Sequence, residues 1–421
     1  MSHKPDDNVR SVMVKGSNRL HIMKVMRHLL VPNKKVQSTL AEIAKYDWLS
    51  KGYRIFSSED ENHRLIPISV SADANLPAPL SDFKIIYSEG KPNEVIDTDW
   101  WNHLKNLVGE KIVTQYQKYW PSSHEFFGDM MIVKIDDNVE QYATEIAHAK
   151  LLSHPFIRLV LSDDGVMGEL RIRDLKPIGA RKDSELYFVN IPLELTHTKV
   201  SIKESGRQIT CDPKVAYYST KLQTERLETL RFAKELRKEI NRPLAVCDPF
   251  CGVGPALSTL IAEENLVGKI LASDLNKSAI KLLFENLQRW DKRDYPDESV
   301  SIEQLYEDRI VGYADATKLC ENMEYAGKWD LMLVNLPHRT IEFLPKLIPL
   351  INRSNISLIR GRVIVAESDI PSANEKINQI LPSIAVGKPK PELKIKRDYS
   401  STLRLCSFEA WIEKAIASSI E

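Results

Sequence analysis

The sequence contains little cysteine and has no excess of charge of either sign. Its five cysteines, Cys211, Cys247, Cys251, Cys320 and Cys406, are odd in number and form no Cys-x-x-Cys pair. This argues against a disulfide framework and a structural zinc site, so we expect no metal and a reducing, cytoplasmic compartment. Lysine plus arginine and aspartate plus glutamate both number 58. If a nucleic acid binds this protein, the basic residues must therefore be gathered on one surface, because the net charge of the chain does not favour binding.

Long hydrophobic runs are also missing. No apolar stretch approaches the ~20 residues that a membrane-spanning helix needs, and the first ten residues lack the apolar core of a secretory signal. We therefore expect no membrane partner. The length of 421 residues predicts two or three domains, and 43% hydrophobic with 28% charged residues is ordinary for a soluble protein. We expect the protein to be a monomer.

The patterning divides the chain into three parts. Residues 1–115 form an N-terminal α/β region of unclear function, with helices predicted over Leu20–Leu30 and Val36–Leu49. Residues 116–212 are predicted as an α+β middle domain that binds RNA. Its expected elements are a helix over Val139–Leu152, a turn at Asp163–Gly165, and strands over Gly128–Ile135, Phe156–Leu161, Leu170–Leu175, Glu185–Ile191, Thr198–Ile202 and Gln208–Cys211.

Strands and helices alternate through residues 213–421, after a long helix over Thr220–Ile240. Such alternation predicts an α/β fold with a doubly wound, Rossmann-like parallel sheet. The expected strands are Leu244–Phe250, Lys269–Asp274, Ile310–Asp315, Asp330–Asn335, Arg362–Glu367 and Leu403–Trp411, and the expected helices between them are Pro255–Glu263, Lys277–Trp290 and Ile341–Leu350.

A glycine-containing turn from Asp248 to Pro255 follows an apolar strand and opens a helix. Glycines there let backbone N–H groups approach a ligand at a helix N-terminus. Asp274 ends the next strand, about twenty residues later, where a carboxylate can accept both ribose hydroxyls. Asp315 ends the strand after that, where it could accept the amine of adenine. Leu257 replaces the third glycine of the dinucleotide fingerprint, which argues against a nicotinamide cofactor.

Two further segments carry side chains suited to chemistry. Asn335 follows a strand whose carboxyl end lies at the ligand edge of the sheet, and its carboxamide can hold the nitrogens of a planar ring. In front of the cofactor segment, Glu225 and Arg226 stand together at a helix start. Each feature also has a structural interpretation, as a strand cap for Asn335 and as a solvated pair for Glu225 and Arg226.

Taken together, in this order and spacing, the segments resemble the archaeal and eukaryotic tRNA guanine-37 N1-methyltransferase family of class I methyltransferases. The resemblance covers roughly residues 120–412. It is carried by Phe127–Ile135, Gly165–Arg173, Lys214–Tyr217, Leu222–Arg226, Cys247–Pro255, Ala272–Asn276 and Val334–Leu344.

The resemblance implies S-adenosyl-L-methionine as cofactor and methyl transfer to N1 of guanosine 37 in the anticodon stem-loop of tRNA. Glu225 matches the family's general base, Arg171 its stabiliser of charge on guanine O6, and Asn335 the residue that orients the base. Arg173 is a possible substitute for Arg171. The implied cofactor residues are Asp248, Phe250, Gly252, Gly254, Pro255, Asp274, Leu275, Asp315, Ala316 and Asn335.

The same resemblance implies contacts with the RNA by Tyr217, Lys221, Arg226 and Pro337. Lys221 stands where the family usually has arginine, and lysine cannot reproduce a bidentate contact. A basic cluster near the C-terminus could also meet phosphate. Its members are Lys388, Lys390, Lys394, Lys396 and Arg397.

Three other interpretations stay open. The first is the aminocarboxypropyl transferase of the wybutosine pathway, against which Asn335 and Asp274 argue. The second is a methyltransferase for amino groups of DNA, RNA or protein glutamine, where Leu336 and His338 interrupt the usual Asn-Pro-Pro-Tyr motif. The third is a non-catalytic RNA-binding protein of the same fold, which would have no need of the base Glu225.

Overall fold

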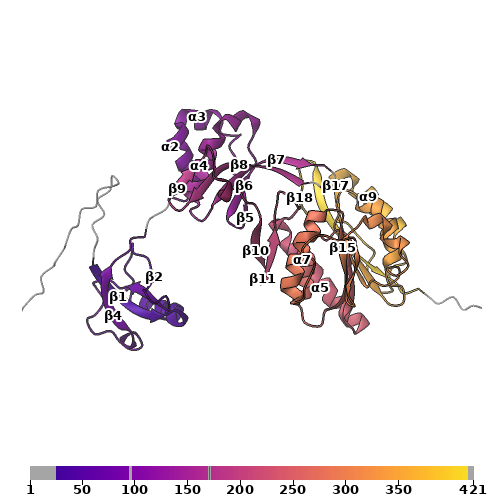
Figure 1. Cartoon of the computed structure of the whole chain (residues 1–421), viewed down its shortest axis with the longest axis horizontal. Helices are drawn as coiled ribbons and strands as arrows, with labels where there is room; N and C mark the ends of the chain where they lie inside the picture. Colours follow the sequence, from indigo (N-terminus) through magenta and orange to yellow (C-terminus); the bar gives the residue numbers. More distant parts are fainter. Residues whose placement is uncertain (1–24, 94–96, 169, 171, 416–421) are drawn as a thin grey trace, which may run out of the picture. The chain divides into compact units, whose positions relative to one another are not determined.

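The computed structural model describes residues 25–93, 97–168, 170 and 172–415 of the chain. Internal contacts divide the chain between Asp97 and Thr98 into two compact units (Figure 1). Helices α2 (Trp100–Val108) and α3 (Glu110–Gln115) belong to the second unit because they share a hydrophobic core with α4 (Ala143–Ser153). The first unit is therefore shorter than the region of residues 1–115 that the patterning indicates.

The first unit is a four-stranded antiparallel sheet with one helix, α1 (Val36–Lys45), which confirms the helix expected there. The helix predicted over Leu20–Leu30 is wrong from Val25 onward, and its first five residues lie outside the described part of the chain. Those later residues form a strand because two neighbouring strands, one on each side, satisfy their backbone groups. In order across the sheet, the strands are β2 (Phe56–Ser57), β3 (His63–Pro67), β1 (Val25–Pro32) and β4 (Lys84–Glu89).

The second unit begins with a five-stranded sheet against which α2 and α4 pack. Met130, Ile132, Leu159 and Leu161 are fully or almost fully buried in it. The order of the strands is β5 (Glu125–Phe127), β6 (Met130–Val133), β7 (Leu159–Met167), β8 (Ile172–Lys182) and β9 (Glu185–Tyr187).

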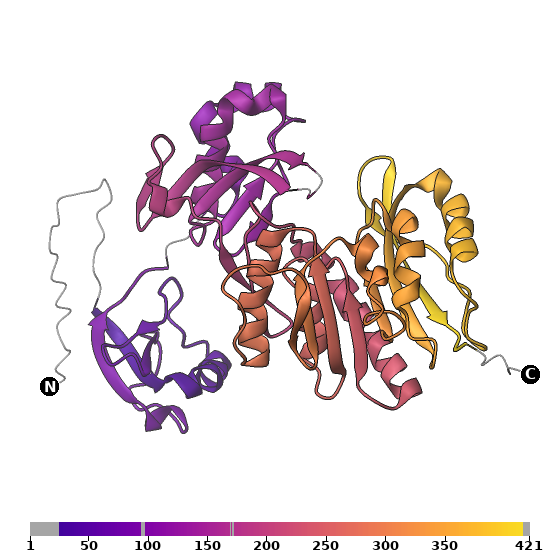
Figure 2. The same cartoon turned by 45° about the vertical axis from the view of Figure 1, so that its right-hand side comes forward.

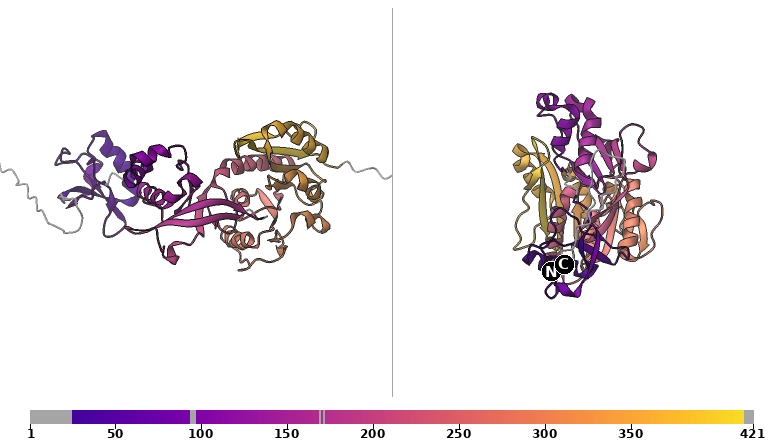
Figure 3. Two further views of the ribbon diagram at one scale, coloured as in Figure 1. Left: turned by 90° about the horizontal axis from the view of Figure 1, so that it is seen from above. Right: turned by 90° about the vertical axis from the view of Figure 1, so that its left-hand side faces the viewer.

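The turn predicted at Asp163–Gly165 is wrong. Strand β7 continues through these residues and pairs with β8, and the two long strands run side by side (Figure 3). A bulge between Asp163 and Val166 absorbs the extra residues, because an unpaired residue in one strand can be accommodated without ending the ladder. The chain reverses only after Met167.

A hairpin of β10 (Val200–Glu204) and β11 (Arg207–Cys211) follows and packs against the last part of the chain. Phe127 and Met130 of the five-stranded sheet, Ile209 of the hairpin, and Val253 and Ala279 of the following fold lie in one hydrophobic core. The middle and last parts of the second unit therefore pack as one body.

The last part is an eight-stranded sheet in the order β14-β15-β13-β12-β16-β17-β19-β18. Five of its strands are mutually parallel, and β14, β18 and β19 pair antiparallel at the two sides. The parallel strands are β12 (Leu244–Asp248), β13 (Val267–Asp274), β15 (Arg309–Tyr313), β16 (Leu331–Val334) and β17 (Ser357–Ala366), and the others are β14 (Glu303–Tyr306), β18 (Lys394–Asp398) and β19 (Leu403–Ile412).

Helices cover both faces of this sheet (Figure 2). One hydrophobic core contains residues of α5, α6 and α7, and a second contains residues of α8 and α9. This arrangement confirms the predicted α/β, doubly wound class. The helices are α5 (Gln223–Ile240), α6 (Pro255–Ile261), α7 (Lys277–Asp291), α8 (Thr340–Leu347) and α9 (Ile370–Ile380). Among the described helices, none is both long and apolar enough to span a bilayer.

Candidate active site

A cavity of about 550 Å³ opens at the carboxyl ends of β12, β13, β15 and β16. The strand order reverses beside β12, because β13 and β15 lie on one side of it while β16 and β17 lie on the other. Doubly wound sheets bind ligands at such switch points, and the volume is typical of small-molecule sites. The wall comes from the loops after these strands, from the segment before α5, and from Gly168 and Leu170 between β7 and β8.

The two glycines of the turn after β12 serve different purposes. Both have positive φ, +54° for Gly252 and +83° for Gly254. Gly252 lines the cavity and donates its N–H to Asp274 Oδ2 at 2.9 Å. A Cβ on Gly254 would lie 2.5 Å from Leu283 Cδ1, so this glycine allows α7 to pack closely. Pro255 then begins α6 at a position that suits its fixed φ.

Three carboxylates stand at or beneath this wall. Asp274 lines the cavity, burial raises its pKa, and it accepts from the backbone of Asn276 and Gly252. Asp315 lines the cavity too, and a hydrogen bond from the Thr317 hydroxyl lowers its pKa. Asp248 is 2% exposed, and burial raises its pKa to about 7. Asp248 is not among the described residues on the cavity wall, and its Oδ1 accepts a hydrogen bond at 3.4 Å from the Phe250 N–H of the loop.

The lining fits a nucleoside. Carboxylates at the ends of two adjacent strands, β13 and β15, are acceptors for sugar hydroxyls and for an exocyclic amine. Apolar surface for a flat ring comes from Phe250, Leu275 and Ala316, which line the same cavity. These acceptors and apolar side chains suit the nucleoside part of S-adenosylmethionine.

Asn335 lines the opposite side of the cavity, directly after β16, with Pro337 and His338. Its Oδ1 accepts a hydrogen bond from Arg362 Nη1 at 2.7 Å. His338 Nε2 lies 3.2 Å from the Tyr399 hydroxyl. The structure thus brings Asn335 into the same cavity as Asp274.

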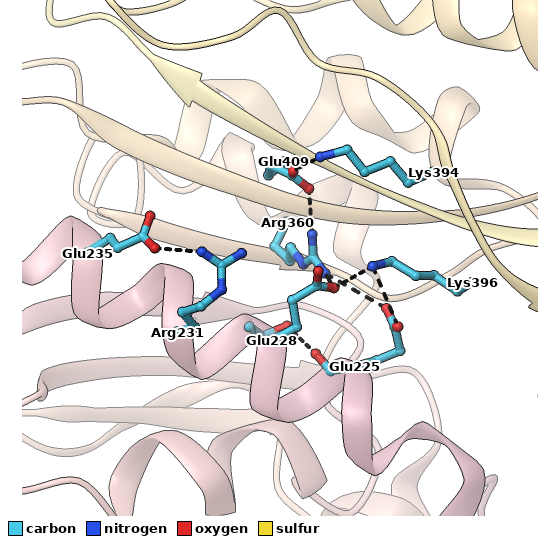
Figure 4. Close-up of polar contacts among 9 residues, drawn as sticks. Glu225, Glu228, Arg231, Glu235, Arg360, Lys394, Lys396 and Glu409 are labelled. Atoms are coloured by element: carbon cyan, nitrogen blue, oxygen red, sulfur yellow. Dashed lines mark hydrogen bonds and ion pairs between the residues drawn. The ribbon is translucent and has the colours of Figure 1, made fainter.

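Glu225 lies in the first turn of α5 within a cluster of ion pairs (Figure 4). Its Oε2 is 3.8 Å from Arg360 Nη2, and its Oε1 is 3.9 Å from Lys396 Nζ. Both cations contact Glu228 more closely, and Lys396 does so at 2.7 Å. Within the described part of the chain, Glu225 Oε2 is buried without a hydrogen-bond partner, and Glu225 is not one of the residues on the cavity wall.

Of the residues expected to face RNA, Tyr217 lines the cavity and is 48% exposed, and Lys221 is exposed just before α5. Arg226 also lines the cavity, but its guanidinium is bound within the protein, whereas a contact with RNA was expected. Its guanidinium is 3% exposed and is bound by both carboxylate oxygens of Glu204 at 2.6 Å and by the Ser219 carbonyl. A phosphate contact would require this pair to break.

Arg171 lies outside the described residues. Its possible substitute, Arg173, is held by Asp163 at 2.7 Å and by Glu125 at 2.9 Å. The structure therefore gives Arg173 a structural ion-pair network in β8 rather than a free guanidinium.

Two arginines on the cavity wall, Arg339 and Arg362, are missing from the sequence-based site. Arg397 also lines the cavity, but the sequence indicated it only as a member of the basic cluster. Arg362 follows Arg360 by two residues in a mostly apolar strand, so the two share one face of β17. This pair of charges is the signal that marks Arg362 in the sequence. Arg397 stands beside a bulge in the edge strand β18.

The basic cluster near the C-terminus is largely consumed by ion pairs. Lys388 pairs with Glu239 at 2.7 Å, Lys394 with Glu409 at 2.6 Å, and Lys396 with Glu228. Lys394 and Lys396 thus tie β18 to β19 and α5, and Lys388, before β18, pairs with α5.

Comparison with known families gives one domain match. Residues 104–179, from α2 into β8, match the TYW2 N-terminal domain. Over 332 residues, or 77% of this chain and 81% of that protein, the chain is 25% identical to the tRNA (guanine(37)-N(1))-methyltransferase Trm5b of Pyrococcus abyssi.

Solved structures share the fold. The crystal structure of Trm5b from Pyrococcus abyssi matches with a TM-score of 0.56 at 20% identity, over 92% of this chain and 99% of that one. The complex of aTrm5 with tRNALeu gives a TM-score of 0.55 at 20% identity, with the same coverage. TYW2 of P. horikoshii in complex with MeSAdo gives 0.50 at 16% identity, over 75% of this chain and 100% of that one.

Proposed function

From its confirmed resemblance to the tRNA (guanine-37-N1)-methyltransferase family, we propose that this chain methylates N1 of guanosine 37 in the anticodon loop of tRNA. The observation that carries the proposal is one cavity lined by both Asp274 and Asn335. The first suits a nucleoside cofactor, and the second suits a planar nitrogen base. The chain is also 25% identical, over 332 residues, to a protein named for this activity.

The proposed cofactor is S-adenosylmethionine, which supplies a methyl group activated on a sulfonium. Asp274 takes the ribose hydroxyls and Asp315 the adenine amine, while Gly252 allows close approach of the backbone. Phe250, Pro255, Leu275 and Ala316 line the cavity around them. Asp248 and Gly254 act from behind the wall by shaping the turn. TYW2 of P. horikoshii, which has this fold, was solved with the adenosine compound MeSAdo.

Glu225 is the proposed general base. Guanine N1 carries a proton at neutral pH, and this proton must leave before N1 can attack the methyl group. In the sequence, Glu225 stands between Leu222 and Arg226, which both line the cavity. Its carboxylate has two cations at nearly 4 Å and no hydrogen bond to Oε2 among the described residues. For this role, rotation of the side chain must bring one carboxylate oxygen to the cavity.

The remaining residues position the RNA. Asn335 and Pro337 hold the flipped guanine, and Tyr217, exposed at the cavity mouth, contacts it. Lys221 meets phosphate, whereas Arg226, bound to Glu204, holds the wall in place. We keep Arg171 as a proposed stabiliser of charge on the base.

A second candidate function has a specific observation in its favour. Residues 104–179 match the TYW2 N-terminal domain. The alternative is therefore the aminocarboxypropyl transfer of the wybutosine pathway, which uses the same cofactor and a modified guanine at the same position of tRNA.

The test uses the full chain, labelled S-adenosylmethionine, and tRNA transcripts with G or A at position 37, with mass spectrometry of the nucleosides. We expect methylguanosine from the G transcript, with a loss of about 10²–10⁴-fold in rate for Glu225→Gln. The matched control is Glu235→Gln. Glu235 is an exposed residue of the same helix, and it forms an ion pair with Arg231. Transfer of an aminocarboxypropyl group would favour the second function, and cofactor binding with no transfer would favour a non-catalytic RNA-binding protein.

A further inference from the structure

Arg362 is placed on the cavity wall by the register of the sheet. Val334 of β16 pairs with Gly361 of β17, so Asn335, directly after β16, and Arg362, within β17, follow as neighbours on two parallel strands. The Arg362 Nη1 to Asn335 Oδ1 bond of 2.7 Å joins them. Strand β17 also pairs with β19 along its length, and Phe408 of β19, opposite Gly361, is fully buried, so Arg362 stands on a packed strand rather than on a loop.

This bond fixes the polarity of Asn335. An arginine has five N–H donors and no acceptor, so only the carboxamide oxygen can face it. The amide NH₂ of Asn335 must then point the other way. Arg362 keeps further N–H donors beyond the one used. Both residues line the cavity, which therefore has a wall that donates hydrogen bonds.

Arg362 differs in its bonding from Arg360 and Arg226, which are buried. Arg360 is bound by Glu228 and Glu409, and Arg226 by Glu204. In the part of the chain that the structure describes, Arg362 donates to a neutral amide and has no hydrogen bond to a carboxylate. Burial lowers its pKa to about 10 while the charge of Glu225 acts in the opposite direction, so Arg362 remains a cation at neutral pH.

We propose that Arg362, together with the Asn335 amide that it orients, recognises a carbonyl oxygen of the target base and thereby selects guanine over adenine. This inference rests on the proposed function. Guanine has O6 as an acceptor beside N1–H as a donor, whereas adenine has an amine and a bare nitrogen there. The guanidinium of Arg362 can donate to O6, and the carboxylate of Glu225, whose charge acts on Arg362, can accept the N1 proton.

The same geometry assists the reaction. When the N1 proton moves to Glu225, negative charge spreads from N1 to O6, where Arg362 is the nearby cation. The ring nitrogen then forms the new bond to the methyl carbon as the bond from that carbon to sulfur breaks. A cation held in place before the reaction costs no reorganisation during it.

The experiment compares tRNA transcripts with guanosine, inosine or adenosine at position 37 as substrates of the full chain. Inosine keeps O6 and N1–H but lacks the 2-amino group. For Arg362→Gln we expect transfer to guanosine and to inosine to fall by about 10²–10³-fold, with an unchanged rate on adenosine, so that selectivity drops. Arg362→Lys keeps the charge and should recover part of the loss. The matched control is Arg404→Gln, since Arg404 pairs with Glu367 and Asp398 away from the described cavity wall.

Two further measurements separate recognition from structure. The pH at half-maximal transfer should move upward in Arg362→Gln, because a cation at O6 makes the N1 proton more acidic, and Arg404→Gln should not move it. Binding of S-adenosylhomocysteine by calorimetry should change less than about twofold, since Arg362 is assigned to the base.

The outcomes distinguish this inference from the proposed function. A wild-type chain that transfers nothing to any of the three transcripts overturns the proposed function. An active wild type whose Arg362→Gln variant keeps its selectivity for guanosine over adenosine overturns only the assignment of Arg362. Loss of S-adenosylhomocysteine binding in a folded Arg362→Gln variant also overturns it, because Arg362 would then hold the cofactor.

Discussion

At the scale of single residues, the buried pair of Arg226 and Glu204 shows how charge supports the cavity wall. Both side chains are 4% exposed, and two oxygens of Glu204 accept from the guanidinium while the Tyr218 hydroxyl donates to Oε2 at 2.7 Å. A buried ion pair contributes little net stability, but removing one partner leaves an uncompensated charge. Arg226 therefore belongs to the cavity wall, and Glu204 balances its charge.

We expect Glu204→Gln to lower the free energy of unfolding by about 3–5 kcal/mol, because the charge of Arg226 stays buried without a counter-ion. Urea denaturation followed by circular dichroism measures it. The exposed pair of Arg231 and Glu235 is the control, and Glu235→Gln should cost less than about 1 kcal/mol. Equal losses in the two variants would contradict the assignment of Arg226 to the buried framework.

At the scale of elements, β17 connects the proposed base to the cavity. It carries Arg360 toward the Glu225 cluster and Arg362 toward Asn335, with Gly361 between them. A Cβ on Gly361 would lie 2.2 Å from Phe408 Cε1, so the bare backbone lets the aromatic ring of β19 pack against the strand. The position of both arginines depends on that contact.

Gly361→Ala should therefore destabilise the protein by about 1–3 kcal/mol, since the ring or the strand must shift. Thermal unfolding measures the effect. A second change, Phe408→Leu, removes the ring and should recover part of the loss when combined with Gly361→Ala. If the double variant is no better than the sum of the two single ones, the contact with Phe408 is not the cause.

The elements also mark the limit of what the sequence predicts. The parallel strands were predictable because each contains an apolar run and most are followed by a helix. Residues at or just after their carboxyl ends, such as Asp274 and Asn335, could therefore be placed at one edge. The edge strands β14 and β18 were not, because they are short and mostly polar and depend on pairing with a neighbour. The contact of Arg362 with Asn335 escaped prediction for another reason, since it depends on the register between β16 and β17.

At the scale of the whole molecule, the hydrophobic cores follow the division at Asp97. One core contains Leu29, Ile43 and Ile66 with residues of the first unit alone, and the other described cores contain residues of the second unit alone. Every described residue on the cavity wall lies between Gly168 and Leu405. Cofactor binding and the stability of the second unit should therefore not need the first unit.

A chain that begins at Thr98 tests this division. We expect it to bind S-adenosylhomocysteine within about twofold of the full chain and to unfold in a single transition, because its cores and cavity are complete without the first unit. Calorimetry measures both. The control is the full chain with Ile43→Asn, whose fully buried side chain lies in the first core, and only the transition of the first unit should then move to lower temperature. A truncated chain that fails to bind the cofactor analogue, or an Ile43→Asn chain that loses both transitions together, would mean that the two units depend on each other for folding.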